Sequence, residues 1–175
     1  MPARPFIVIT QEMIEEANRF IPATLVPRTR ASQHDTLTGN LGELIFAQFF
    51  HGDFRRHKLG QTKGETDFPD IEIKTSAHPF RQTLHLLIRS DYETRRRPPF
   101  YVLVVLDVEK PKAPPQVGCK AILCGYCSWK EARWHGHERS FATGDGGFIC
   151  LAVPMQSLHK MSQFGAAYRK HSEKR

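Results

Sequence analysis

The spacing of hydrophobic residues predicts a helix near the N-terminus. Positions 11–20 repeat apolar residues at helical spacing, through Met13, Ile14 and Ala17. Thr10 stands just before this segment, where its hydroxyl can accept a hydrogen bond from an amide of the first turn. The following stretch, 22–35, has no clear period and is expected to be a basic connecting loop.

A second helix is predicted over 38–50, and it has apolar residues on every side. Such a helix should be buried. Glu43 and Gln48 interrupt it. An unpaired ionised carboxylate in that place would cost several kcal/mol, so Glu43 needs a partner, a metal ion or access to a cleft.

Short apolar or alternating runs predict the strands of a sheet. They lie at 54–59, 70–75, 83–89, 100–108, 120–126 and 148–153. The run at 100–108 is apolar without interruption as far as Asp107, which suits a central strand covered on both faces.

Two helices are expected after the central strands. Ser128 followed by Glu131 is a capping-box pattern for a short helix that ends near Gly136. Apolar residues beyond Pro154 fit a C-terminal helix that leads into a basic tail. The length favours one domain over 1–175, with a core of about 36–153, an N-terminal helix at 11–20 and a C-terminal helix and tail at 155–175.

The charge of the chain favours a polyanionic partner. Twenty-five Lys and Arg residues against 18 Asp and Glu give a formal net charge of +7. No segment approaches the roughly 20 continuous apolar residues that span a bilayer, and the first residues lack the apolar region of a secretory signal. We therefore expect a cytoplasmic protein without membrane contact.

The four cysteines lie close together in the sequence. Cys119, Cys124 and Cys127 have the C-x4-C-x2-C spacing seen in some iron–sulfur proteins, and Cys150 follows. The residues between them read as a strand, on which alternation would place Cys124 and Cys127 on opposite faces. We therefore expect reduced, buried thiols instead of an iron–sulfur or zinc site.

The segment IEIK, residues 71–74, combines an acidic and a basic side chain that could act together in catalysis. On a strand, Ile71 and Ile73 would point into the core, while Glu72 and Lys74 would share the opposite face. A second carboxylate precedes them. Paired carboxylates can hold Mg²⁺, which activates water for phosphodiester hydrolysis, and a lysine can orient that water or neutralise the transition state.

Two aspartates compete for the place of that second carboxylate. Asp67 precedes a turn, and Asp70 belongs to the literal Pro-Asp dipeptide. We prefer Asp67, because Asp70 would stand on the same strand and face as Glu72, whereas a turn residue can approach from the side. Asp70 remains the alternative metal ligand.

The order of these residues resembles the PD-(D/E)XK nuclease superfamily. A helix glutamate in LGELIFAQFF is followed by an aspartate in GETDFPD and then by IEIKTS. The resemblance covers about 39–76, and it departs from the family pattern in the short separation of aspartate and glutamate. It implies an α/β fold with a restriction-endonuclease-like core, in which helices flank a mixed central β-sheet.

The same resemblance implies a function and a set of roles. The chain would be a Mg²⁺-dependent endonuclease acting on DNA, with Mn²⁺ as a substitute ion and duplex DNA as the expected substrate. Asp67 and Glu72 would bind metal, with Glu43 and the Ile73 backbone carbonyl as further ligands, and Lys74 would be the catalytic lysine.

The basic runs are then expected to contact phosphates without reading sequence. These residues are Arg55, Arg56 and Lys58, and Arg95, Arg96 and Arg97. Cleavage of both strands would favour a homodimer. Two other functions remain open: a catalytically silent nucleic-acid-binding protein of the same fold, and an adaptor protein in which Glu43 pairs with a basic residue.

Overall fold

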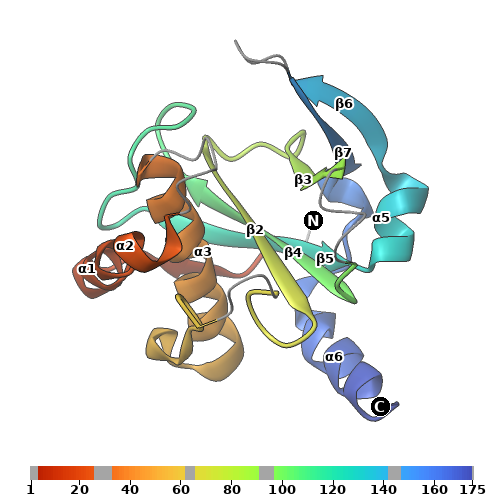
Figure 1. Cartoon of the computed structure of the whole chain (residues 1–175), viewed down its shortest axis with the longest axis horizontal. Helices are drawn as coiled ribbons and strands as arrows, with labels where there is room; N and C mark the ends of the chain where they lie inside the picture. Colours follow the sequence, from red (N-terminus) through yellow and green to blue (C-terminus); the bar gives the residue numbers. More distant parts are fainter. Residues whose placement is uncertain (1–3, 26–32, 62–65, 91–96, 142–146, 175) are drawn as a thin grey trace.

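The protein is a mixed α/β structure built in three layers (Figure 1). The computed structural model describes residues 4–25, 33–61, 66–90, 97–141 and 147–174. Helices form one outer layer, a four-stranded sheet lies in the middle, and a three-stranded sheet with one short helix forms the other outer layer.

The middle sheet, sheet A, has the strand order β1-β5-β4-β2. Strands β2 and β4 are parallel, and the other neighbouring strands are antiparallel. β2 is therefore an edge strand of this sheet. The bounds are Phe6–Val8 for β1, Ile71–His78 for β2, Phe100–Asp107 for β4 and Lys120–Cys127 for β5.

The second sheet, sheet B, is antiparallel with the order β3-β7-β6. Its strands are His85–Arg89 (β3), His137–Phe141 (β6) and Phe148–Pro154 (β7). The sequence pattern led us to expect one central sheet, and the strands instead divide between two.

The helices flank these sheets. The N-terminal ones are α1 (Gln11–Arg19), α2 (Ile21–Thr24) and α3 (Gln33–His51), and the C-terminal ones are α5 (Trp129–His135) and α6 (Phe164–Ser172). The 3₁₀ segments of the described residues are Phe54–Arg56 (η1), Met155–Ser157 (η2) and Met161–Gln163 (η3).

The two faces of sheet A pack against different layers. Side chains of α1, α3 and α6 pack on one face, and side chains of sheet B and α5 pack on the other. β4 contributes to both cores, with Val102 on the helical side and Leu103 on the other, and both are buried. This confirms the expectation of a central strand covered on both faces.

The two helix caps expected from the sequence are confirmed. Thr10 caps α1 by accepting from the Met13 amide, and Ser128 and Glu131 form the expected capping box of α5.

Other expectations were wrong. The expected strand at 54–59 is instead η1 followed by a loop, because the Asp53 carboxylate accepts from the Arg55 amide and the Gln48 side chain accepts from the Phe54 amide. The expected loop at 22–35 includes part of α2 and the start of α3, with 26–32 outside the described residues. Strands β1 and β6 were missed: β1 has three residues, and β6 is nearly all polar and exposed.

Candidate active site

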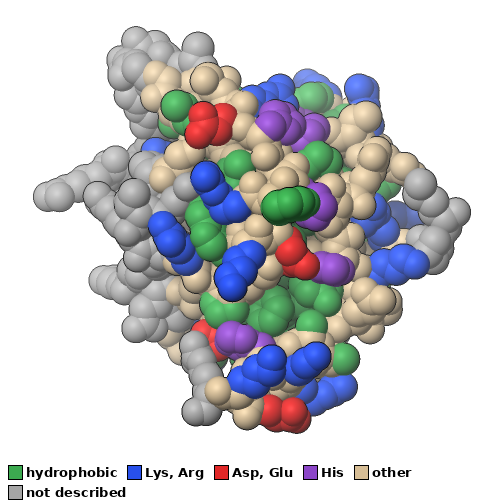
Figure 2. Space-filling model, turned by 90° about the vertical axis from the view of Figure 1, so that its right-hand side faces the viewer, with side chains coloured by type: hydrophobic (Ala, Val, Ile, Leu, Met, Phe, Trp, Pro, Cys, Tyr) green, Lys and Arg blue, Asp and Glu red, His purple; other side chains and the backbone are tan. Residues whose placement is uncertain are grey.

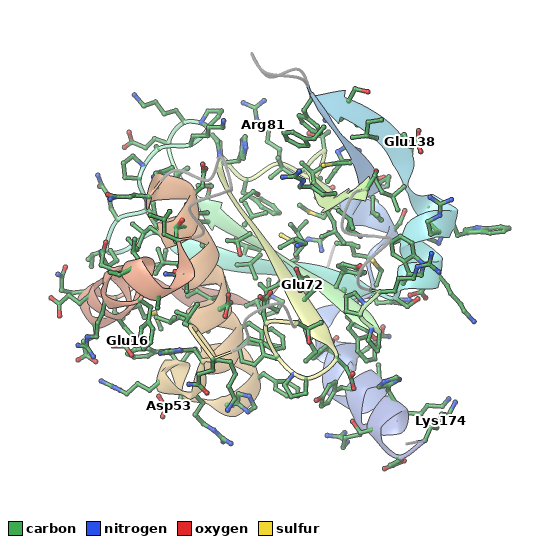
Figure 3. The ribbon with its side chains drawn as sticks, viewed as in Figure 1. Glu16, Asp53, Glu72, Arg81, Glu138 and Lys174 are labelled. Atoms are coloured by element: carbon green, nitrogen blue, oxygen red, sulfur yellow. The ribbon has the colours of Figure 1, made fainter. Side chains whose placement is uncertain are left out.

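Strand β2 carries Glu72 and Lys74 on one face, as its alternation predicts. The Lys74 Nζ lies 2.7 Å from a Glu72 carboxylate oxygen, and both side chains are partly buried. Ile71 and Ile73 point to the opposite face and enter the core beneath the helices. Glu72 therefore faces the layer of sheet B, and its side chain lies near the middle of the view in Figure 3.

A tight turn brings Asp67 to the outer edge of β2. Phe68 and Ile71 exchange two backbone hydrogen bonds around Pro69 and Asp70, and Asp70 has a φ of 66°. Proline followed by a residue with positive φ is the pattern of a type II turn. The chain reverses there, and an Asp67 carboxylate oxygen accepts a hydrogen bond of 2.7 Å from the Ile73 amide.

The helix glutamate reaches the same place from the other side of the sheet. Glu43 is partly buried on α3, and its carboxyl group shares a hydrogen bond with Asp67. Burial raises the pKa of Glu43 well above its ordinary value, and the negative charges of Asp67 and Glu72 raise it further. Glu43, Asp67 and Glu72, here called the carboxylate cluster, thus lie around the outer edge of β2, an edge strand of sheet A.

A glycine lets α3 approach β2 closely enough for this contact. A Cβ atom placed on Gly42 would lie 1.7 Å from the Thr75 Oγ1, and that buried hydroxyl oxygen has no hydrogen-bond partner. Gly42 directly precedes Glu43. The close approach of helix and strand at this point therefore sets the distance from Glu43 to the edge of β2.

Asp70 points away from the cluster. Its carboxylate oxygen lies 3.4 Å from the Nε2 of His171 on α6, and the Tyr168 hydroxyl of the same helix donates to the Pro69 carbonyl. The geometry therefore favours Asp67 as the partner of Glu72. The reason differs from the expected one, because Asp70 lies in the turn before β2 instead of on the strand face.

The Ile73 carbonyl faces the same edge as Asp67. Amide and carbonyl groups of one strand residue point to the same side, and this side alternates along the strand. The Ile73 amide points to Asp67, while the Asp70 carbonyl accepts from Phe100 of β4. Ile73 therefore directs both its backbone groups to the outer edge of β2, where a carbonyl could join a ligand set.

The oxygen atoms at this edge are of the types that bind a hard divalent ion. They are carboxylate and carbonyl oxygens, which Mg²⁺ prefers, and one or two carboxylates commonly suffice because waters complete the octahedron. Among the described residues, no group of three or more His, Cys, Asp and Glu side chains is placed to hold a metal ion. Here Glu43 hydrogen-bonds to Asp67 and Glu72 pairs with Lys74, so a metal would replace these internal contacts.

Part of the expected basic surface lines a groove next to the turn. The groove has a volume of about 430 Å³ and is bounded by the 51–61 segment, the 68–71 turn and Tyr168. Arg55, Arg56 and Lys58 all contribute to it. Burial lowers the pKa of His51 in the same groove, and the positive charges of Arg56 and Lys58 lower it further. Arg55 also pairs with Glu12 at 2.8 Å.

The second basic run is only partly described. Arg95 and Arg96 lie outside the described residues. The Arg97 guanidinium lies over the ring of Trp129, 5.6 Å from its centroid, and that ring contacts Tyr101, the β4 neighbour of Glu72. Trp129 was not among the predicted site residues, and its only signal in the sequence is its place directly after Ser128, the cap of α5.

The cysteines do not gather at one site. Cys119 packs beside the core under the helices, whereas Cys124 and Cys127 lie in the core on the other face of sheet A. Our expectation that Cys124 and Cys127 face opposite ways was wrong, because a bulge near Gly125 shifts the register. Burial raises the pKa of both these thiols to about 12, which keeps them protonated.

Comparison with known proteins returns no match: no family model and no curated protein matches the sequence, and no solved structure matches the fold. Among the described residues there is no helix with the length and apolar character needed to cross a membrane.

Proposed function

We propose that this chain is a divalent-metal-dependent endonuclease that hydrolyses phosphodiester bonds of DNA. The observation that carries the proposal is the meeting of Glu43 with Asp67 and Glu72 beside Lys74, from a helix, a turn and a strand. A structural role would be better served if Glu43 paired with a basic residue. Its electrostatic neighbours are instead two carboxylates.

The order and placement of these groups support a restriction-endonuclease-like core of the PD-(D/E)XK kind. A bound Mg²⁺ would polarise the phosphate and acidify the attacking water. Asp67 and Glu72 would hold the ion, with the Ile73 carbonyl at the same edge. Glu43 would be a further ligand of the ion or of its coordinated waters. Because its pKa is raised, Glu43 holds a proton before the ion binds, so metal binding should release that proton.

Lys74 would position the attacking water and neutralise negative charge in the transition state. Its ammonium group pairs with Glu72 at 2.7 Å, so it lies within reach of any phosphate or water that Glu72 contacts. The groove beside the 68–71 turn would receive the sugar–phosphate backbone, because Arg55, Arg56 and Lys58 give it a positive lining.

Nicking of supercoiled plasmid in the presence of Mg²⁺ or Mn²⁺ tests the proposal. Removal of the Lys74 ammonium group in Lys74→Ala should reduce the rate about 100-fold or more, as expected for loss of a group that stabilises transition-state charge. Lys110→Ala is the matched control, because Lys110 is exposed on a loop that follows β4. Undiminished cleavage by Lys74→Ala would remove Lys74 from the mechanism.

A catalytically silent nucleic-acid-binding protein is the second candidate. The observation that favours it is that the polar groups of the site already have partners within the protein. Lys74 pairs with Glu72, and Glu43 shares a hydrogen bond with Asp67. It predicts salt-sensitive DNA binding with no cleavage in Mg²⁺ or Mn²⁺. Metal-dependent nicking that Lys74→Ala abolishes would exclude it.

A further inference from the structure

An unusually exposed tryptophan lies on the short helix α5. Trp134 is 84% exposed, the highest value among the exposed large hydrophobic side chains of the described residues. Lys130 and Arg133 are also exposed. Lys130 lies four residues before Trp134 and therefore on the same side of the helix, and Arg133 is its neighbour in the chain. An exposed indole ring with cations on the same short helix marks a binding surface.

A chain of side-chain neighbours links this helix to the candidate active site. Glu72 and Tyr101 are register neighbours on β2 and β4, so their side chains share one face of sheet A. The Tyr101 ring contacts Trp129 at a centroid distance of 6.3 Å, and Arg97 lies over the Trp129 ring. Trp129 is the first residue of α5. The residues Arg97, Trp129, Lys130, Arg133 and Trp134 form what is called here the α5 surface.

We propose that the α5 surface binds an unpaired nucleic-acid strand that extends from the site of cleavage. The Trp134 ring would stack on a base, and Lys130 and Arg133 would contact the neighbouring phosphates. Aromatic rings interleaved with cations are the means by which proteins bind single strands without sequence preference. Bases inside a duplex are already stacked on each other, so an exposed indole favours an unpaired base.

The charge of the surroundings supports an anionic partner over an apolar or basic protein surface, and the exposed Trp134 ring favours one that also offers a flat ring for stacking. Figure 2 shows the side of the molecule that carries α5 and sheet B, where Lys and Arg side chains are spread over the face and Asp and Glu side chains are few and separate. One acidic group of α5, Glu131, is engaged in the capping box and lies 2.6 Å from His159. The chain as a whole carries a net charge of +7.

The inference rests on the proposed function for the class of ligand, and its test is independent of cleavage. The protein has two tryptophans, so Trp129→Phe leaves Trp134 as the single reporter of intrinsic fluorescence. This variant is titrated in EDTA with an oligothymidylate of about 12 nucleotides, within the site sizes of single-strand binders, and with a duplex of the same length. EDTA prevents metal-dependent cleavage during the titration.

We expect the single strand to quench Trp134 fluorescence, and the duplex to quench it less at equal occupancy. In the otherwise unchanged protein, Trp134→Ala should weaken oligothymidylate binding about fivefold or more, as for loss of one base stack. Lys130→Ala should lower the salt dependence of log K by about 0.7, the value for one phosphate contact on a single strand.

Phe6→Ala is the matched control. Phe6 on β1 is 49% exposed and has a cation, Lys120, 4.9 Å from its ring centroid, but it lies on the far edge strand of sheet A. It should bind the oligonucleotide as the unchanged protein does. Equal affinity for Trp134→Ala and the unchanged protein, or binding without quenching, would overturn the α5 surface. Quenching without any cleavage would support the surface while the nuclease proposal fails.

Discussion

The contact between Gly42 and Thr75 gives the sharpest prediction about the fold and the site together. In Gly42→Ala, the new Cβ would lie 1.7 Å from the Thr75 Oγ1, 2.8 Å from its Cβ and 2.9 Å from its Cγ2. Non-bonded heavy atoms in contact lie about 3.5 Å apart. Rotation of the Thr75 side chain cannot remove the Cβ contact, so α3 and β2 have to separate by roughly 1 Å.

A second glycine of the same helix supplies the control. A Cβ placed on Gly39 meets nothing within 4 Å. Gly39→Ala should therefore stabilise the protein by about 0.5–1 kcal/mol through helix propensity alone. Gly42→Ala gains the same propensity but incurs an overpacking cost of about 1–3 kcal/mol. We expect the two variants to differ by that cost, with Gly42→Ala the less stable.

Urea unfolding followed by far-UV circular dichroism measures the difference. With a slope of about 2 kcal/mol per molar urea, the midpoints should differ by roughly 0.5–1.5 M. The same displacement moves Glu43 from Asp67, and a shift of about 1 Å at a catalytic group can reduce activity about 100-fold. Adding Thr75→Ala should restore part of the loss. Equal midpoints for Gly42→Ala and Gly39→Ala would refute the reasoning.

Two further predictions concern the titratable groups. The folded protein holds a proton on Glu43 that the unfolded chain releases, because burial and the two neighbouring carboxylates raise its pKa. From the ordinary glutamate pKa up to the raised one, this group makes stability fall as pH rises, by at most about 1.4 kcal/mol per pH unit. Glu43→Gln should flatten that slope in urea titrations from about pH 4 to about pH 9, and an unchanged slope would contradict the assignment. Burial raises the pKa values of Cys124 and Cys127 to about 12, so both thiols should resist iodoacetamide at about pH 8 until urea unfolds the chain. The less buried Cys119 should react in the folded protein. Peptide mass spectrometry distinguishes these sites, and rapid labelling of Cys124 in the folded protein would count against a buried thiol.

Features decided by neighbouring residues could be predicted from the sequence. The cap at Thr10 and the capping box at Ser128 depend on hydrogen bonds within one helical turn. The shared face of Glu72 and Lys74 follows from strand alternation, and the two-sided burial of β4 follows from its uninterrupted apolar run. Each of these patterns is complete within about ten residues.

Features decided by distant contacts could not be predicted in the same way. The bulge at Gly125 puts Cys124 and Cys127 on one side of sheet A, and it depends on pairing with β4. At position 125 a Cβ would lie 2.6 Å from the His159 carbonyl oxygen, from a segment more than thirty residues away in the chain. Alternation alone cannot reveal such a register shift.

The carboxylate cluster shows the division most clearly. The sequence by itself determined that β2 presents Glu72 and Lys74 together, and that a glutamate on an apolar helix needs a partner. The tertiary structure decided that Asp67 and not Asp70 meets Glu43, because a turn with positive φ at Asp70 folds Asp67 onto the edge of β2 and directs Asp70 towards His171. It also decided that Glu43 reaches this edge, because α3 packs closely on β2 at Gly42. The point at which a helix meets a strand is set by three-dimensional packing, which no local sequence pattern encodes.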